Sequence, residues 1–102
     1  MSEIVVTDEP GSDRYAIDVD GARAGLLTYE LEPQRISLMH AEIDPAMEGR
    51  GLGSRLIAFA LEDARARGLA VLPFCPFVKS YIERHGEYLE LVPEPSRARL
   101  GL

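Results

Sequence analysis

A glycine-rich segment between a strand-like run and an amphipathic helix carries the clearest chemical signal in this sequence. Its three alternate glycines are Gly49, Gly51 and Gly53. Because glycine has no Cβ atom, the backbone there can turn tightly and lie close to a ligand. The first turn of the following helix has N–H groups without partners, and the helix dipole adds roughly half a positive charge. Arg50 and Arg55 bracket the segment with full positive charges. The segment therefore predicts a binding site for a phosphate or pyrophosphate group.

The residues around these glycines exclude two common phosphate-binding motifs. A P-loop requires Lys followed by Ser or Thr after its last glycine, whereas Gly53 is followed by Ser54 and Arg55. A dinucleotide-binding fold requires an acidic residue about 20 residues further on. Glu62 and Asp63 come too early and lie on the helix itself. One alternative without a ligand stays open, in which the glycines only shape a turn from strand to helix.

Composition and charge predict one acidic domain. At 102 residues the chain has room for a single domain, which we expect to span residues 1–102. The net charge of −6 argues against nucleic-acid binding, which depends on clustered Lys and Arg. The single cysteine, Cys75, suits a reducing compartment.

Localisation and metal binding follow from what the sequence does not contain. We expect no signal peptide and no membrane span, because neither a basic start followed by an apolar run nor about 20 consecutive apolar residues occur. The expected compartment is the cytoplasm. We also expect no metal site, because His40, His85 and Cys75 are too far apart in sequence to form a ligand cluster.

Hydrophobic patterning predicts the elements that position the glycine segment. Strands are expected at residues 4–6, 15–19, 26–31, 36–43, 69–73 and 88–92. Helices are expected at residues 51–67 and 77–85, followed by a frayed tail over 93–102. Within the first helix, Asp63 and Arg67 are spaced to form an ion pair. The predicted fold class is α+β, with two main helices on a mostly antiparallel mixed sheet.

This order of elements, with the residues at two of its junctions, resembles the GNAT-type N-acetyltransferases. In that superfamily an R/Q-x-x-G-x-G/A segment after the fourth strand holds the pyrophosphate of acetyl-coenzyme A, and Gly51 and Gly53 match its two glycines. A tyrosine in a later helix, shortly before a glycine, serves there as general acid, and Tyr81 matches it. Glu48 departs from the pattern, because Arg or Gln usually stands at its position. Backbone donors and the two neighbouring arginines then have to bind the phosphates.

A narrower resemblance is to a subfamily of very small GNAT-like proteins with a Pro-x-Cys stretch. It rests on His40 and on residues 72–78, which include Pro73 and Cys75. The resemblance covers residues 14–92. It implies a minimal GNAT-like acyl-CoA N-acyltransferase fold, acetyl-CoA as cosubstrate and an amine of unknown identity as acceptor. The residues expected at the cosubstrate are Ile43, Glu48, Gly49, Arg50, Gly51, Leu52, Gly53, Ser54 and Arg55.

Four residues are candidates for catalysis under this resemblance, and they are His40, Glu42, Cys75 and Tyr81. His40 and Glu42 are two residues apart, so on a strand they share one face, where a base could take the proton of the amine. His titrates near neutrality and suits this role directly, whereas Glu acts through a water or after burial. The alternative is a polar pair at the sheet surface. Tyr81 is expected to protonate the departing thiolate, or else to be a half-buried aromatic residue.

Cys75 separates two mechanisms. In direct transfer the amine attacks acetyl-CoA, and Cys75 only packs in the core. In covalent transfer Cys75 is acetylated first, which requires a stabilised thiolate. Its position at the start of the second helix, between Pro73 and Pro76, makes a helix dipole available for the second mechanism.

These residues are compatible with three functions. The first is an enzyme that moves an acetyl group from acetyl-CoA to an amine, which the catalytic candidates favour. The second is a non-catalytic acyl-CoA-binding or interaction module on the same fold, which Glu48 favours. The third is an acidic interaction protein without a CoA site. No sequence element specifies the acceptor or the oligomeric state.

Overall fold

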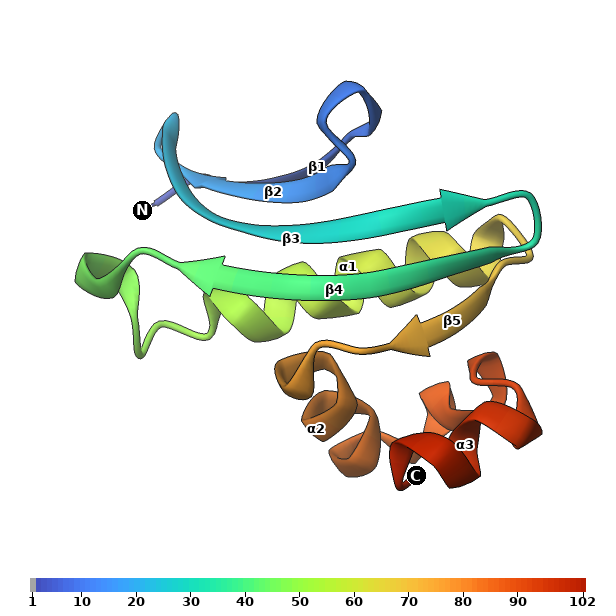
Figure 1. Ribbon diagram of the computed structural model, residues 1–102. Helices are drawn as coiled ribbons and strands as arrows, with labels where there is room; N and C mark the ends of the chain where they lie inside the picture. Colours follow the sequence, from blue (N-terminus) through green and yellow to red (C-terminus); the bar gives the residue numbers. More distant parts are fainter. Residues whose placement is uncertain (1) are drawn as a thin grey trace.

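A curved five-stranded sheet with one long helix across one face organises the chain (Figure 1). The computed structural model describes residues 2–102. The strands follow one another in sequence order across the sheet and are β1 (Ile4–Glu9), β2 (Arg14–Val19), β3 (Ala22–Glu32), β4 (Arg35–Ile43) and β5 (Ala70–Pro73). The first four are antiparallel neighbours, whereas β5 pairs with β4 in parallel.

Three α-helices and three short 3-10 helices complete the chain. The α-helices are α1 (Leu52–Ala66), α2 (Pro76–Arg84) and α3 (Glu94–Leu100). The 3-10 helices are η1 (Pro10–Ser12), η2 (Pro45–Met47) and η3 (Gly86–Leu91). The predicted α+β class with a mostly antiparallel mixed sheet is confirmed, with α3 as an additional helix.

Helix α1 supplies the core with one apolar face. Its buried residues recur at helical spacing and are Leu52, Leu56, Ile57, Ala60, Leu61 and Ala64. They pack against the sheet face that carries the buried side chains of Tyr15, Leu27 and Leu38. The Tyr15 hydroxyl donates to Asp63 at 2.7 Å, and Arg67 donates to the same carboxylate at 3.1 Å. The predicted Asp63–Arg67 pair is therefore confirmed, and the hydrogen bond from Tyr15 to Asp63 joins the end of α1 to the sheet.

A β-bulge in β4 decides which way its last residues face. Thr28 pairs with His40, whereas the next residue of β3, Tyr29, pairs with Leu38. Met39 is thus an extra residue on β4, and the alternation of side chains changes phase there. Leu38 faces α1, but after the bulge it is Ala41 that faces α1, while His40 faces the opposite side of the sheet.

Strands β4 and β5 separate halfway along β4. Their pairing ends at Leu38 and Pro73, after which β4 continues to Ile43 while the chain leaves β5 and enters α2 (Figure 1). The N–H of Cys75 donates to the carbonyl of Leu38 at 2.9 Å, and this is where the two segments part. The split leaves the outer edge of β4 without a strand partner from Met39 onward.

Two predictions about the C-terminal part are wrong. Residues 88–92 do not form a strand but lie mostly in η3, because the Tyr88 hydroxyl donates to Glu62 of α1 at 2.7 Å and local bonds from Tyr88 and Val92 to His85 and Leu89 satisfy the backbone. The tail is not frayed, because residues 94–100 form α3. That helix begins with Glu94 and ends with arginines, which complement its dipole, and Gly101 caps it at φ 74°.

Candidate functional site

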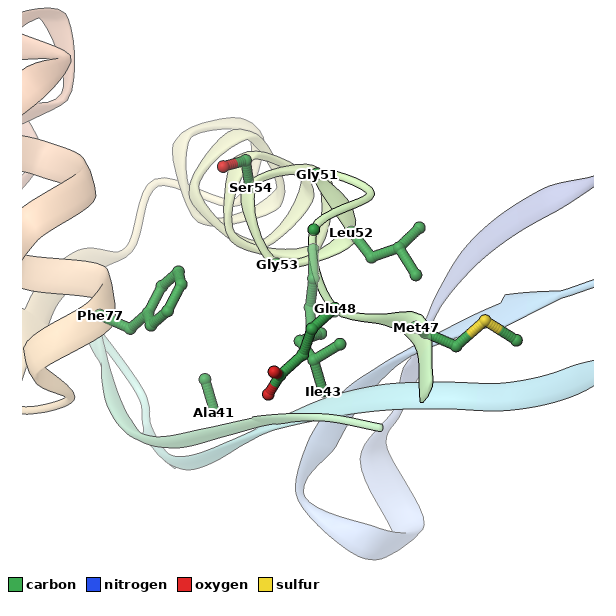
Figure 2. A pocket seen from close by; sticks show the side chains of 11 residues that line it. Ala41, Ile43, Met47, Glu48, Gly51, Leu52, Gly53, Ser54 and Phe77 are labelled. Carbon is green, nitrogen blue, oxygen red and sulfur yellow. The ribbon is translucent and has the colours of Figure 1, made fainter. Parts of the chain in front are cut away.

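A pocket of about 390 Å³ lies where the end of β4, the start of α1 and the start of α2 meet (Figure 2). This volume falls within the range of small-molecule sites, roughly 300–1,000 Å³. The lining residues are Ala41, Ile43, Met47, Glu48, Gly49, Gly51, Leu52, Gly53, Ser54, Leu56 and Phe77. The pocket therefore opens into the split between β4 and β5 on the face that carries α1.

The glycine segment forms one wall of this pocket. Gly49 and Gly51 have φ angles of 82° and 73°, a left-handed conformation that side chains with a Cβ rarely adopt. Gly51 is the N-cap of α1, and the first helical bond runs from the Arg55 N–H to its carbonyl at 3.2 Å. Within residues 2–102 the N–H groups of Leu52, Gly53 and Ser54 have no acceptor. Such donors, together with the helix dipole, are the chemistry that suits an anion.

Seven of the nine residues predicted at the cosubstrate line this pocket. The two that do not are the arginines. The guanidinium of Arg50 lies 3.1 Å from the sulfur of Met47 and 3.5 Å from the hydroxyl of Ser2. Arg55 is exposed one turn into the helix. Positive potential at the pocket therefore comes first from the backbone.

Glu48 is the residue that fits an anionic guest least. Figure 2 shows its carboxylate directed into the pocket, toward β4. The first turn of α1 has no acidic residue of its own and offers N–H donors. Glu48 places a negative charge beside this turn. Its charge opposes the binding of a phosphate without blocking the backbone donors.

Sequence reasoning missed four lining residues, and they are Ala41, Met47, Leu56 and Phe77. The position of Ala41 could have been predicted, because alternate side chains of a strand face the same side and Ile43 was already assigned to the pocket. Nothing in the sequence around the glycine segment predicts Phe77 as a lining residue, because its ring reaches the pocket from α2. A Cβ placed on Gly53 would lie 3.4 Å from that ring, so the glycine allows the two helices to approach. Phe77 is 54% exposed, so its ring is accessible to a molecule in the pocket.

His40 and Glu42 share a face, as predicted, but this face is the one opposite α1. The Nε2 atom of His40 lies 3.2 Å from a carboxylate oxygen of Glu42, and the side chains are 62% and 63% exposed. Neither residue lines the pocket. The bulge at Met39 is the cause, because it turns both side chains away from α1.

Tyr81 lies on the buried face of α2 and is 7% exposed. Its ring stacks on His85 with centroids 4.0 Å apart, and the ring of Tyr88 lies 6.0 Å away. Burial, followed by the charge of Glu87, raises the pKa of the Tyr81 hydroxyl above its usual value. Tyr81 therefore keeps its proton at neutral pH.

Cys75 is 3% exposed and belongs to the hydrophobic core. It is the N-cap of α2, and its carbonyl accepts the N–H of Lys79 at 3.0 Å. Its own N–H is bound to Leu38, so Cys75 sits at the split between β4 and β5. The cysteine is enclosed by apolar side chains of the core and does not line the pocket.

Metal sites and membrane spans were also sought among the described residues. Residues 2–102 hold no group of three or more His, Cys, Asp or Glu side chains arranged around a metal position. No helix in that range is both long enough and apolar enough to cross a membrane.

Comparison with known families places this geometry in a class. The model of a GCN5-related N-acetyl-transferase family, Acetyltransf_CG, matches residues 14–91, which is most of the chain. The chain therefore belongs to the GCN5-related N-acetyltransferases. A comparison with curated proteins gives no match. The matched range includes the four catalytic candidates and the glycine turn, which consists of Gly49, Gly51, Leu52, Gly53 and Ser54.

Proposed function

We propose that this chain transfers the acetyl group of acetyl-CoA to an amine. The observation that carries the proposal is the turn at Gly51, where three unpartnered N–H groups open into a pocket beside the split in the sheet. Family membership supports the same type of reaction. In this proposal Leu52, Gly53 and Ser54 bind the pyrophosphate of acetyl-CoA through their backbones.

The unpaired edge of β4 is the natural support for the rest of the cosubstrate. An extended amide-containing arm pairs with a free strand edge as another strand would. Ala41 and Ile43 line the pocket along this edge, and the ring of Phe77 covers it from α2. This arrangement directs the thioester toward Leu38 and Cys75, where the edge ends.

The amine enters in this proposal from the face that carries His40 and Glu42. His40 and the pocket for acetyl-CoA then lie on opposite faces of the sheet, and the split between β4 and β5 connects the two faces. His40 takes the proton of the attacking amine, and Glu42, 3.2 Å away, orients the imidazole. The new bond joins the amine nitrogen to the acetyl carbon, and the carbon–sulfur bond breaks. Tyr81, which is protonated at neutral pH, donates its proton to the thiolate.

Burial favours direct transfer over acetylation of Cys75. A thiol that attacks a thioester has to be accessible and partly ionised. At 3% exposure and within the hydrophobic core, Cys75 resembles a packing residue. Its role is then to hold the start of α2 against Leu38.

A second function, acyl-CoA binding without catalysis, is favoured by one specific observation. The Glu48 carboxylate lies in the pocket, and none of the four catalytic candidates lines it. A domain that only senses acyl-CoA needs the turn at Gly51 but none of these four side chains.

Calorimetry with CoA and acetyl-CoA, followed by a thiol-release assay over a panel of amines, separates these functions. The proposal expects binding, turnover with at least one amine, and a loss of about tenfold or more in turnover in Tyr81→Phe. The matched control is Tyr88→Phe, which removes the hydroxyl of the neighbouring ring and is expected to keep turnover. Binding without turnover supports the second function, and absence of binding refutes both.

A further inference from the structure

A second cavity lies between β5 and the C-terminal helix α3. Its volume is about 210 Å³, and it is lined by Leu72, Phe74, Ser96, Arg99 and Leu100. Three of the lining side chains are apolar, and the other two, Ser96 and Arg99, are hydrogen-bond donors. At roughly 30 Å³ per water molecule, the cavity has the size of one apolar side chain together with a small polar group.

The cavity belongs to the sheet face that carries His40. Leu72 pairs with Ser37 of β4, whereas the residues on either side, Val71 and Pro73, pair with Ile36 and Leu38, which face α1. Side chains alternate along a strand, so Leu72 points to the face opposite α1. Phe74, 51% exposed, follows at the split between the strands. The first pocket and this cavity therefore lie on opposite faces, with the split between them.

The distance from this cavity to the proposed base is short. Ser37, opposite Leu72, precedes His40 by three residues on β4, a path of about 10 Å along a strand. A molecule anchored beside Leu72 and Phe74 and extended along β4 thus reaches His40 with its far end.

The polar end of the cavity is cationic. Within residues 2–102 no carboxylate lies within 4.0 Å of the Arg99 guanidinium, and its hydrogen bond is to the hydroxyl of Ser96 at 3.5 Å. Ser96 is buried and offers a second donor. No acidic side chain lines the cavity. A guanidinium and a hydroxyl beside apolar walls suit a carboxylate attached to an apolar group.

We propose that this cavity anchors the acceptor, and that the acceptor is a short apolar peptide with a free carboxyl terminus. Arg99 and Ser96 bind the terminal carboxylate, while Leu72, Phe74 and Leu100 contact the last side chain. Three or four extended residues, at about 3.4 Å each, then bring the amino terminus to His40. This inference rests on the proposed acetyl transfer, and it names the substrate class for that reaction.

The test compares the peptide Ala-Ala-Leu with its carboxamide, which keeps the amine and the leucine side chain but lacks the charge. Amide chemical shifts of the protein are followed by NMR during titration with each peptide, without CoA. We expect shifts at Leu72, Phe74 and Leu100 and an affinity about two- to fivefold higher for the acid, as for an ion pair at an exposed site. In Arg99→Gln this preference disappears. Arg84→Gln, which removes an exposed charge from α2, keeps it.

Turnover is measured separately, so that the two proposals fail in different ways. In the parent protein the acid is expected to have a kcat/KM about two- to fivefold above that of the carboxamide. In Arg99→Gln the two values are expected to be equal. Calorimetry with CoA serves as a control for Arg99→Gln and should be unchanged. If the acid does not bind at millimolar concentration, or if its preference survives in Arg99→Gln, the acceptor site is refuted even where other amines are acetylated. If the acid binds as expected but nothing is turned over, the acetyl-transfer proposal fails and the peptide site stands.

Discussion

Glu48→Gln is the substitution that tests most directly whether the turn at Gly51 binds phosphates. It removes one negative charge from the pocket and keeps the shape of the side chain. We expect CoA to bind more tightly to this variant, because the carboxylate lies in the pocket beside the unpartnered N–H groups of α1. The measurement is the dissociation constant of CoA by calorimetry.

The size of the effect follows from Coulomb's law in a solvent-exposed setting. Two unit charges at about 7 Å in water repel one another by roughly 0.6 kcal/mol. A pyrophosphate with two charges raises this to about 1 kcal/mol, or about fivefold in affinity. Glu48 is exposed, so the dielectric constant of water is the appropriate one. Salt screens such a repulsion, since the Debye length falls from about 10 Å at 0.1 M to about 3 Å at 1 M.

Two controls separate this repulsion from other effects. Glu83→Gln removes an exposed charge from α2, far in sequence from the glycine segment, and should leave the affinity for CoA within about twofold. Pantetheine has no phosphates, so its affinity should not change in Glu48→Gln. An affinity for CoA that is unchanged at low salt would refute the position assigned to the phosphates. A weaker affinity would show that the Glu48 carboxylate accepts a hydrogen bond from the ligand.

Three further substitutions test the turn, the mechanism and the C-terminal packing. Gly51→Val forces a β-branched residue to φ 73°, at a cost of at least about 1–2 kcal/mol, and is expected to weaken CoA binding at least about tenfold in calorimetry, whereas Gly11→Val in a distant turn should not. Cys75→Ala is expected to keep thiol release within about threefold. In the parent protein, intact mass after incubation with acetyl-CoA should show no acetyl group on Cys75. An adduct that disappears in the variant together with the activity would establish the covalent mechanism instead. The hydrogen bond to Glu62 raises the pKa of Tyr88 to about 12, so the folded state holds this proton more tightly than the unfolded chain, and the resulting stability is complete below about pH 10 and is lost as the pH rises through 12. Thermal midpoints across this range should fall less steeply in Tyr88→Phe, and equal slopes would contradict the assignment.

Local signals in the sequence predicted much of the fold, and the exceptions have identifiable physical causes. The apolar spacing of α1 and its start after Gly51 are properties of a few adjacent residues, and both predictions are confirmed. Residues 88–92 have the composition of a strand, but Tyr88 is held by Glu62, 26 residues earlier in the chain. Residues 94–100 carry a helix signal, which is an acidic start with arginines before Gly101. The prolines and arginines from residue 93 onward favoured a frayed tail instead, so the helix was not predicted.

Most residues that line the pocket were predictable from local sequence. Glycines at positive φ, a helix start and the departure at Glu48 are local features, and seven of the nine predicted residues line the pocket. The positions of the remaining residues around the pocket depend on contacts between elements that are distant in the chain. The bulge at Met39 depends on pairing with β3, and it sends His40 to the opposite face of the sheet. Phe77 reaches Gly53 across 24 residues of chain because α1 and α2 pack together. Such contacts depend on which elements meet in space, and a pattern within one element does not encode that.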